Sequence, residues 1–173
     1  MTDTLRTENG RSVLRLERRF PHKLEKVWRA LTDPQQLGQW YPAIPVEMEP
    51  RLGGAIRFDY GQGTPTTAVI TALDGPQLFA FTEQALMQTE RESQSLLRFE
   101  THPEAGGCLL VFRQTFSDRP AAAIYAAGWQ ACFDALAQLL NGEPIRREPV
   151  SPDRVKAYAE AFGLVPATGP IRN

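Results

Sequence analysis

Residues with catalytic chemistry are few in this sequence. The only histidines, His22 and His102, are far apart in the chain, and each stands beside a proline. Such a pair does not supply the clustered ligands of a zinc site or the base of a catalytic triad. The HExxH and GxSxG motifs and a phosphate-binding loop are also missing. We therefore expect no metal and no cofactor, and the residues favour binding over turnover.

Three polar side chains, Arg18, Tyr60 and Gln114, lie on otherwise apolar faces of predicted strands. A polar group that faces inward needs a partner or water, because leaving it bare costs free energy. In one interpretation these groups orient a mostly apolar ligand. In the other, Arg18 pairs with a carboxylate such as Glu47 or Glu49, and Gln114 lies at a solvated rim.

Two carboxylates, Asp59 and Glu83, could supply acid–base chemistry if both faced inward. Side chains alternate along a strand, so Asp59 points away from Tyr60 and into solvent. The pair is therefore left out of the predicted site. Among the aromatic residues, Trp28 fits core packing, and Trp129 fits packing of a helix against a sheet.

The longest predicted element is a helix over residues 121–140. At about 100° per residue, its apolar side chains share one half of the cylinder: Ile124, Tyr125, Gly128, Trp129, Cys132, Phe133, Leu136, Leu139 and Leu140. Gly128 and Cys132 are small residues at the middle of this face, where dense packing would favour Leu or Ile. Either the helix approaches a sheet closely at Gly128, or it covers a space for a ligand. The helix face alone favours close packing.

The rest of the pattern predicts an antiparallel sheet. Seven strands are expected, at residues 12–20, 44–50, 55–60, 66–73, 77–83, 93–100 and 108–116. Residues 84–92 are polar and indicate a longer loop. Two short helices, at residues 24–31 and 34–40, follow the first strand.

Composition limits the class of protein. The chain has 173 residues and a net charge of -1, and its basic residues are dispersed, which argues against nucleic acid and anionic membranes as partners. No apolar run has the length of a membrane span, and the first residues do not form a signal peptide. We expect a cytoplasmic protein with Cys108 and Cys132 as free thiols.

The domain organisation expected from the sequence has three parts. Residues 1–11 form a polar segment, residues 12–142 form the domain, and residues 143–173 form an extension with a short helix. The apolar stripe of that helix, around Tyr158, should dock on its own domain, with a homodimer contact as the alternative.

Several motifs together resemble the Hsp90-ATPase-activator-homologue group of the START-like, helix-grip superfamily. They are VLRLERRF (residues 13–20), VWRALTDP (27–34), LGQW (37–40), RLGG (51–54) and GW (128–129). The resemblance covers residues 11–142. It implies an α+β helix-grip fold, in which a curved seven-stranded antiparallel sheet grips the long helix and encloses a cavity. It favours the cavity interpretation of Gly128 and Cys132, and it puts Trp40 and Tyr41 near the cavity mouth.

The superfamily includes lipid carriers, hormone receptors and polyketide cyclases, so the fold implies no single chemistry. We expect a small hydrophobic or amphipathic ligand that is carried, sensed or sequestered. One alternative is a cyclase-like or hydrolase-like enzyme that uses Arg18, Tyr60 and Gln114. Another is a module that binds an Hsp90-type chaperone, but the eukaryotic activators use a separate N-terminal domain, which we do not expect here. The predicted ligand-binding residues are Arg18, Trp28, Trp40, Tyr41, Met48, Phe58, Tyr60, Phe99, Phe112, Gln114, Tyr125, Gly128, Trp129 and Cys132.

Overall fold

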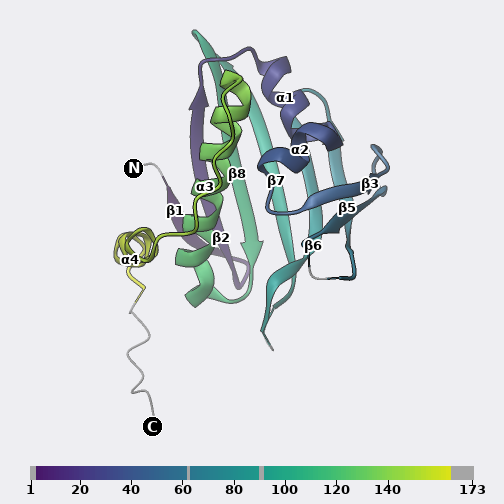
Figure 1. Cartoon of the computed structure of the whole chain (residues 1–173). Helices are drawn as coiled ribbons and strands as arrows, with labels where there is room; N and C mark the ends of the chain where they lie inside the picture. Colours follow the sequence, from purple (N-terminus) through teal and green to yellow (C-terminus); the bar gives the residue numbers. More distant parts are fainter. Residues whose placement is uncertain (1–2, 62, 90–91, 165–173) are drawn as a thin grey trace.

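One antiparallel sheet of eight strands organises the chain, with spatial order β1-β2-β8-β7-β6-β5-β4-β3. The computed structural model describes residues 3–61, 63–89 and 92–164, without the side chains of residues 46, 84–89, 92 and 93. The strands are β1 (Thr4–Glu8), β2 (Arg11–Phe20), β3 (Ile44–Met48), β4 (Ala55–Asp59), β5 (Thr66–Asp74), β6 (Leu78–Thr89), β7 (Glu92–Glu104) and β8 (Gly107–Phe116). Figure 1 shows the sheet curving around the helices that cover one of its faces.

The strand count differs from the seven that the sequence predicts. The N-terminal segment contributes β1, which pairs with β2 through a turn at Asn9 and Gly10, both with positive φ. This tight turn suits a right-handed hairpin twist. The predicted loop at residues 84–92 was also wrong for most of its length, because β6 continues to Thr89 and β7 begins at Glu92. Neither residues 4–8 nor residues 84–92 show the alternation of apolar and polar residues that identifies a strand in a sequence. Both segments were therefore missed as strands.

Two short helices follow β2, as predicted: α1 (Leu24–Thr32) and α2 (Pro34–Trp40). The Asp33 carboxylate caps α2 by accepting a hydrogen bond from the Gln35 backbone N–H at 2.9 Å. The indole of Trp40 donates to the Ala30 carbonyl at 2.8 Å and so ties the two helices together. This bond fixes the position of the α2 end, where Tyr41 and Pro42 follow.

The long helix α3 (Ala122–Asn141) comes after a short 3-10 turn, η1 (Arg119–Ala121), and ends at Gly142 with φ of 71°. Its packed face is formed by residues that are at most 5% exposed: Ala122, Ala126, Trp129, Phe133, Leu136 and Leu140. Gly128 and Cys132 are only half-buried and lie on one flank of the helix. The prediction that they sit at the middle of the buried face was therefore wrong, because the apolar face is rotated toward the alanines.

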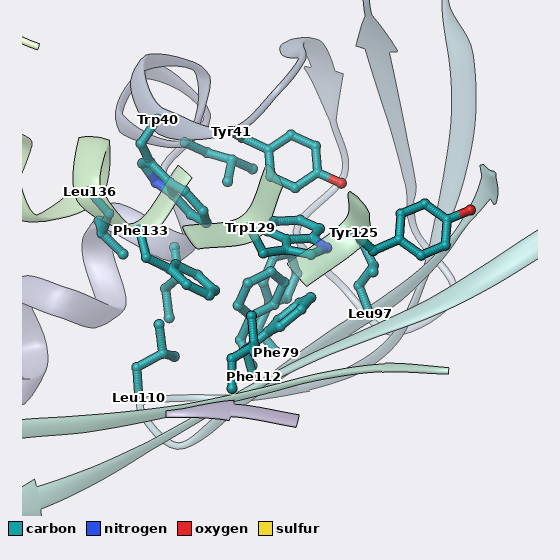
Figure 2. Packing of buried hydrophobic residues seen from close by; sticks show 14 of the residues in the cluster. Trp40, Tyr41, Phe79, Leu97, Leu110, Phe112, Tyr125, Trp129, Phe133 and Leu136 are labelled. Carbon is teal, nitrogen blue, oxygen red and sulfur yellow. The ribbon is translucent and has the colours of Figure 1, made fainter. Parts of the chain in front are cut away.

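Aromatic rings fill the space between α3 and the sheet. The Trp129 ring lies 4.4 Å from that of Phe112 and 5.6 Å from that of Tyr41, between centroids. Figure 2 shows Trp129 at the centre of this cluster, with Tyr41 on one side and Phe112 on the other. Phe99 continues the stack at 5.0 Å from Phe112. The residues expected to wall an interior cavity thus pack against one another.

A short last helix, α4 (Pro152–Ala161), packs against α3 of the same chain. Tyr158 is 2% exposed, and its hydroxyl lies 2.9 Å from both Asp3 Oδ2 and Gln130 Oε1. Arg154 on α4 also pairs with Asp134 on α3 at 3.5 Å. The C-terminal extension therefore covers the polar side of α3 around Gln130, whereas Asp134 stays exposed.

We call residues 143–150, which connect α3 to α4, the C-terminal strap. In Figure 1 the strap runs back along α3 toward α4. The Arg146 backbone N–H donates to Gln138 Oε1 at 2.7 Å. Arg147 donates to the carbonyls of Gln39 at 2.9 Å and Gly38 at 3.1 Å, in the last turn of α2. Because carbonyls at a helix end lack helical partners, a cation is well placed there.

Candidate functional site

A pocket of about 410 Å³ lies among the end of α2, one flank of α3 and the strap. Trp40 and Pro42 form the α2 side, and Arg147, Glu148 and Val150 form the strap side. The flank of α3 contributes Ile124, Tyr125, Gly128, Trp129, Cys132 and Ala135. The lining is thus mostly apolar, and its two charged residues both come from the strap.

Small side chains explain why the flank of α3 is hollow. A Cβ atom placed on Gly128 would meet no atom within 4 Å. Cys132 and Ala135 follow on the same side of the helix at spacings of four and three residues, so they continue the hollow. Burial raises the pKa of the Cys132 thiol to about 12, which keeps it protonated at neutral pH. The pocket thus holds no activated cysteine nucleophile at this position.

Next to the pocket, a buried carboxylate accepts two hydrogen bonds from tyrosines. Glu83 on β6 is 5% exposed. Its Oε2 atom accepts from the Tyr41 hydroxyl at 2.8 Å and from the Tyr60 hydroxyl at 2.9 Å. Tyr41 follows α2 and Tyr60 follows β4, so elements far apart in sequence build this cluster. We call these three residues the Glu83 cluster.

Burial gives Glu83 an unusual acidity. Removal from water raises the pKa of Glu83 to about 7, against the two tyrosine hydrogen bonds, which act to lower it. Burial and the nearby carboxylate also raise the pKa values of Tyr41 and Tyr60 well above the usual range. At neutral pH the tyrosines are therefore donors, whereas a pKa of about 7 leaves Glu83 present in both its protonated and its ionised form.

A second set of linked hydrogen bonds lies beside this cluster. The Trp129 indole donates to Gln114 Oε1 at 2.8 Å, and Gln114 Nε2 donates to Ser95 Oγ at 3.3 Å. Ser95 is the cross-strand partner of Glu83. Polar groups from β6, β7, β8 and α3 thus share one buried layer at this part of the sheet.

The structure brings together only part of the predicted ligand-binding set. Five of its members line the pocket: Trp40, Tyr125, Gly128, Trp129 and Cys132. Tyr41, Tyr60 and Gln114 belong to the polar layer behind it. Phe58, Phe99 and Phe112 are buried in the aromatic core and Met48 packs against it, while Trp28 lies against the turn at Gly75.

Arg18 occupies a separate region. It pairs with Asp3 at 2.9 Å, and its guanidinium carbon lies 5.9 Å from the centroid of the Phe133 ring. The predicted partners Glu47 and Glu49 pair instead with Arg57 and Arg51. Arg18 is the register partner of Leu110, four residues along β8 from Gln114. It is therefore part of the contact that holds α4, apart from Tyr60 and Gln114.

Sequence reasoning set Glu83 aside together with Asp59, and it missed the strap. Glu83 follows Phe79 and Phe81 at a spacing of two, so alternation places all three on the inner face. The same argument that selected Arg18 and Gln114 would have selected Glu83. No pattern in residues 143–150 indicates that Arg147 reaches the end of α2, because that contact depends on the tertiary fold.

Comparison with known proteins identifies the family. The model of the family described as "Activator of Hsp90 ATPase homolog 1-like protein" matches residues 21–141. The chain belongs to this family. The match spans both short helices, the sheet from β3 to β8, and α3, and therefore includes the Glu83 cluster.

Solved structures share the fold of this Hsp90-ATPase-activator-like chain. CalU16 from Micromonospora echinospora has 20% identity and a TM-score of 0.71, with 94% of each chain covered. The conserved protein EF2215 from Enterococcus faecalis has 22% identity and a TM-score of 0.73, covering 96% of this chain and 94% of that one. DynU16, from the dynemicin biosynthetic locus, has 23% identity and a TM-score of 0.66, covering 78% of this chain and 49% of that one. No curated protein matches the chain.

The family match and these structures together establish the helix-grip fold, and the chemistry has to be inferred from the site itself. In the described ranges, no helix is both long and apolar enough to span a bilayer. Among the residues that the structure describes, no group of three or more His, Cys, Asp or Glu residues could hold a metal ion.

Proposed function

We propose that the protein binds a small hydrophobic or amphipathic molecule in the pocket among α2, α3 and the strap. Its role would be carriage, sensing or sequestration of that molecule. The observation that carries the proposal is the hollow flank of α3 at Gly128, where small side chains leave about 410 Å³ beside three aromatic residues, Trp40, Tyr125 and Trp129. Pockets for small ligands are typically about 300–1,000 Å³ and mostly apolar.

Three features support binding over simple imperfect packing. The walls come from elements that are fixed elsewhere, since Trp40 is tied to α1 and Trp129 to the sheet. Arg147 holds the strap over the pocket through the α2 carbonyls. A larger residue at Gly128 would fill the space, because no close contact requires that position to be small. The occurrence of DynU16 in a biosynthetic locus accords with this proposal.

Native mass spectrometry of protein purified from its own host tests the proposal. We expect a copurifying small molecule in wild-type protein and its loss in Gly128→Leu, which places a branched side chain in the pocket. Ala157→Leu, at an exposed position of α4, is the matched control and should retain the molecule. Equal retention by both variants would rule out the pocket as the binding site.

A second candidate function is catalysis of the cyclase or hydrolase type. The observation that favours it is Glu83, because a pKa of about 7 suits a group that gives and takes protons at neutral pH. In this case the copurifying molecule would be chemically changed by wild-type protein and recovered unchanged from Glu83→Gln. Identical products from the two proteins would leave binding as the function.

A further inference from the structure

The charged residues and the exposed apolar residues of the pocket lie at different positions along α3. The Arg146 backbone bonds to Gln138 near the C-terminal end of α3, and from there the strap runs back along the helix (Figure 1). Arg147 therefore comes first along the pocket and Val150 later, toward Ile124 in the first turn of α3. Ile124 is 42% exposed and Val150 is 39% exposed, so an apolar ligand body that covered them would remove both from water.

Arg147 presents its charge to the pocket from a fixed position. Its Nη2 atom donates to the carbonyls of Gly38 and Gln39. Nη2 carries two of the five N–H groups of the guanidinium, so three N–H groups remain for other acceptors. Within the described ranges, Arg147 has no carboxylate partner. Burial raises the pKa of the Cys132 thiol and the charge of Arg147 acts to lower it, which puts that charge near the hollow flank of α3.

Glu148 also lines the pocket and carries the opposite charge. Its side chain is exposed, and no group in the described part of the chain is bonded to it. Glu148 is therefore free to turn toward water, whereas Arg147 is tied to the end of α2. We expect Glu148 to weaken the binding of an anion without preventing it. Because repulsion grows with charge, it disfavours a doubly charged head group more than a singly charged one.

We propose that Arg147 is the head-group anchor of this pocket, and that the ligand is an amphipathic carboxylic acid, bound as its anion with its apolar body along the hollow flank of α3. This inference rests on the pocket-binding function proposed above and names the class of ligand. A hydrogen bond from a guanidinium to a carboxylate is stronger than one between neutral groups. The lining from Ile124 to Ala135 covers about 16 Å at about 1.5 Å per helical residue, so a linear apolar body fits along it.

Three octyl probes keep the body constant and change only the head group: at neutral pH octanoate is an anion, 1-octanol is neutral and octylamine is a cation. Trp40 and Trp129 line the pocket, so tryptophan fluorescence would follow the binding of each probe. A pocket without an anchor would prefer octanol, because a carboxylate loses more hydration on burial. We expect wild-type protein to bind octanoate about tenfold more tightly than octanol, and octylamine least tightly.

Two substitutions in the strap should change this preference in opposite directions. Arg147→Gln should reverse it, so that octanol binds more tightly than octanoate. Glu148→Gln leaves the bonds of Arg147 to α2 in place and should raise the affinity for octanoate about threefold. The control Lys156→Gln removes a positive charge from an exposed position of α4, outside the pocket lining, and should match wild-type protein.

Ionic strength provides a second measurement that a purely structural role of Arg147 would not reproduce. Salt screens the attraction between a partly exposed guanidinium and a carboxylate. The affinity of wild-type protein for octanoate should therefore fall several-fold between low and high salt, while the affinity for octanol should not fall. In Arg147→Gln the affinity for octanoate should lose this salt dependence.

The outcomes distinguish the anchor from the pocket. If octanol binds wild-type protein more tightly than octanoate and Gly128→Leu weakens both, the pocket function stands and the Arg147 anchor is wrong. If Arg147→Gln weakens all three probes by the same factor, Arg147 only holds the strap, and the anchor is again wrong. A copurifying host molecule without an acidic group would also contradict it.

If no probe binds and no host molecule copurifies, both proposals fail together. A preference for octanoate that is present in wild-type protein and lost in Arg147→Gln supports the anchor.

Discussion

The indole N–H of Trp129 donates to Gln114 Oε1 at 2.8 Å, and this bond joins the wall of the pocket to the centre of the sheet. Trp129 is 5% exposed and Gln114 is 4% exposed, so neither can exchange its partner for bulk water. The Trp129 ring, and with it one side of the pocket, is therefore held by this amide on β8 as well as by the rings packed around it.

Replacing Gln114 with Leu should destabilise the protein by about 1–3 kcal/mol, because it leaves a buried N–H without an acceptor. Urea denaturation followed by tryptophan fluorescence would measure the loss. Gln77→Leu, at an exposed position in the turn before β6, is the control and should change stability by less than about 0.5 kcal/mol. Equal effects of the two substitutions would mean that the Trp129 bond contributes nothing specific.

Glu83 should make stability fall with rising pH. Its pKa in the folded protein is about 7 and its ordinary value is 4.5, so the folded state holds a proton that the unfolded state releases. The associated stability is fully present below about pH 4.5 and is lost as pH rises through about 7. At 1.36 kcal/mol per pKa unit, the loss is about 3 kcal/mol.

Denaturation of wild-type protein and Glu83→Gln across this pH range would measure that contribution. The difference between the two stability curves should grow in favour of Glu83→Gln as pH rises. Glu160→Gln, on the surface of α4, should follow the wild-type curve. Parallel curves for wild type and Glu83→Gln would show that Glu83 titrates at its ordinary pKa.

Much of the scaffold could be predicted because its signals are local. Alternation found β2, helical spacing with the Asp33 cap found α1 and α2, and the family motifs predicted the order of the elements. The site was harder, because its contacts join distant residues. Glu83 meets Tyr41 and Tyr60 only after β6, α2 and β4 come together, and a helical wheel cannot tell that alanines, instead of Gly128, face the sheet.

The contacts of the strap and α4 could not be predicted from the sequence for the same reason. The pattern around Tyr158 predicted a helix with an apolar stripe, and the structure places that helix on α3 of the same chain. The partners of Tyr158 are polar, however: Asp3 near the N-terminus and Gln130 on α3. No spacing rule connects residues so far apart in sequence.

Asp3 should therefore help to hold α4 in place. Its side chain is 1% exposed and pairs with Arg18 at 2.9 Å, while the Tyr158 hydroxyl lies 2.9 Å from its other oxygen. Asp3→Ala leaves Arg18 without its counter-charge and should cost about 1–3 kcal/mol. Limited proteolysis should then cut the strap faster than in wild type. Asp153→Ala, exposed at the start of α4, serves as the control, and equally slow cleavage in both variants would contradict this role.

Gly128 should be dispensable for folding and important only for the pocket. It lies inside α3, where glycine costs about 1 kcal/mol relative to alanine, and a Cβ atom there meets nothing within 4 Å. Gly128→Ala should thus stabilise the protein by about 0.5–1 kcal/mol in chemical denaturation. Gly142→Ala is the matched contrast, since its φ of 71° disfavours any side chain, and it should destabilise the protein. A loss of stability in Gly128→Ala would mean that the flank of α3 is packed more closely than its geometry shows, and the pocket would then have no room for a ligand.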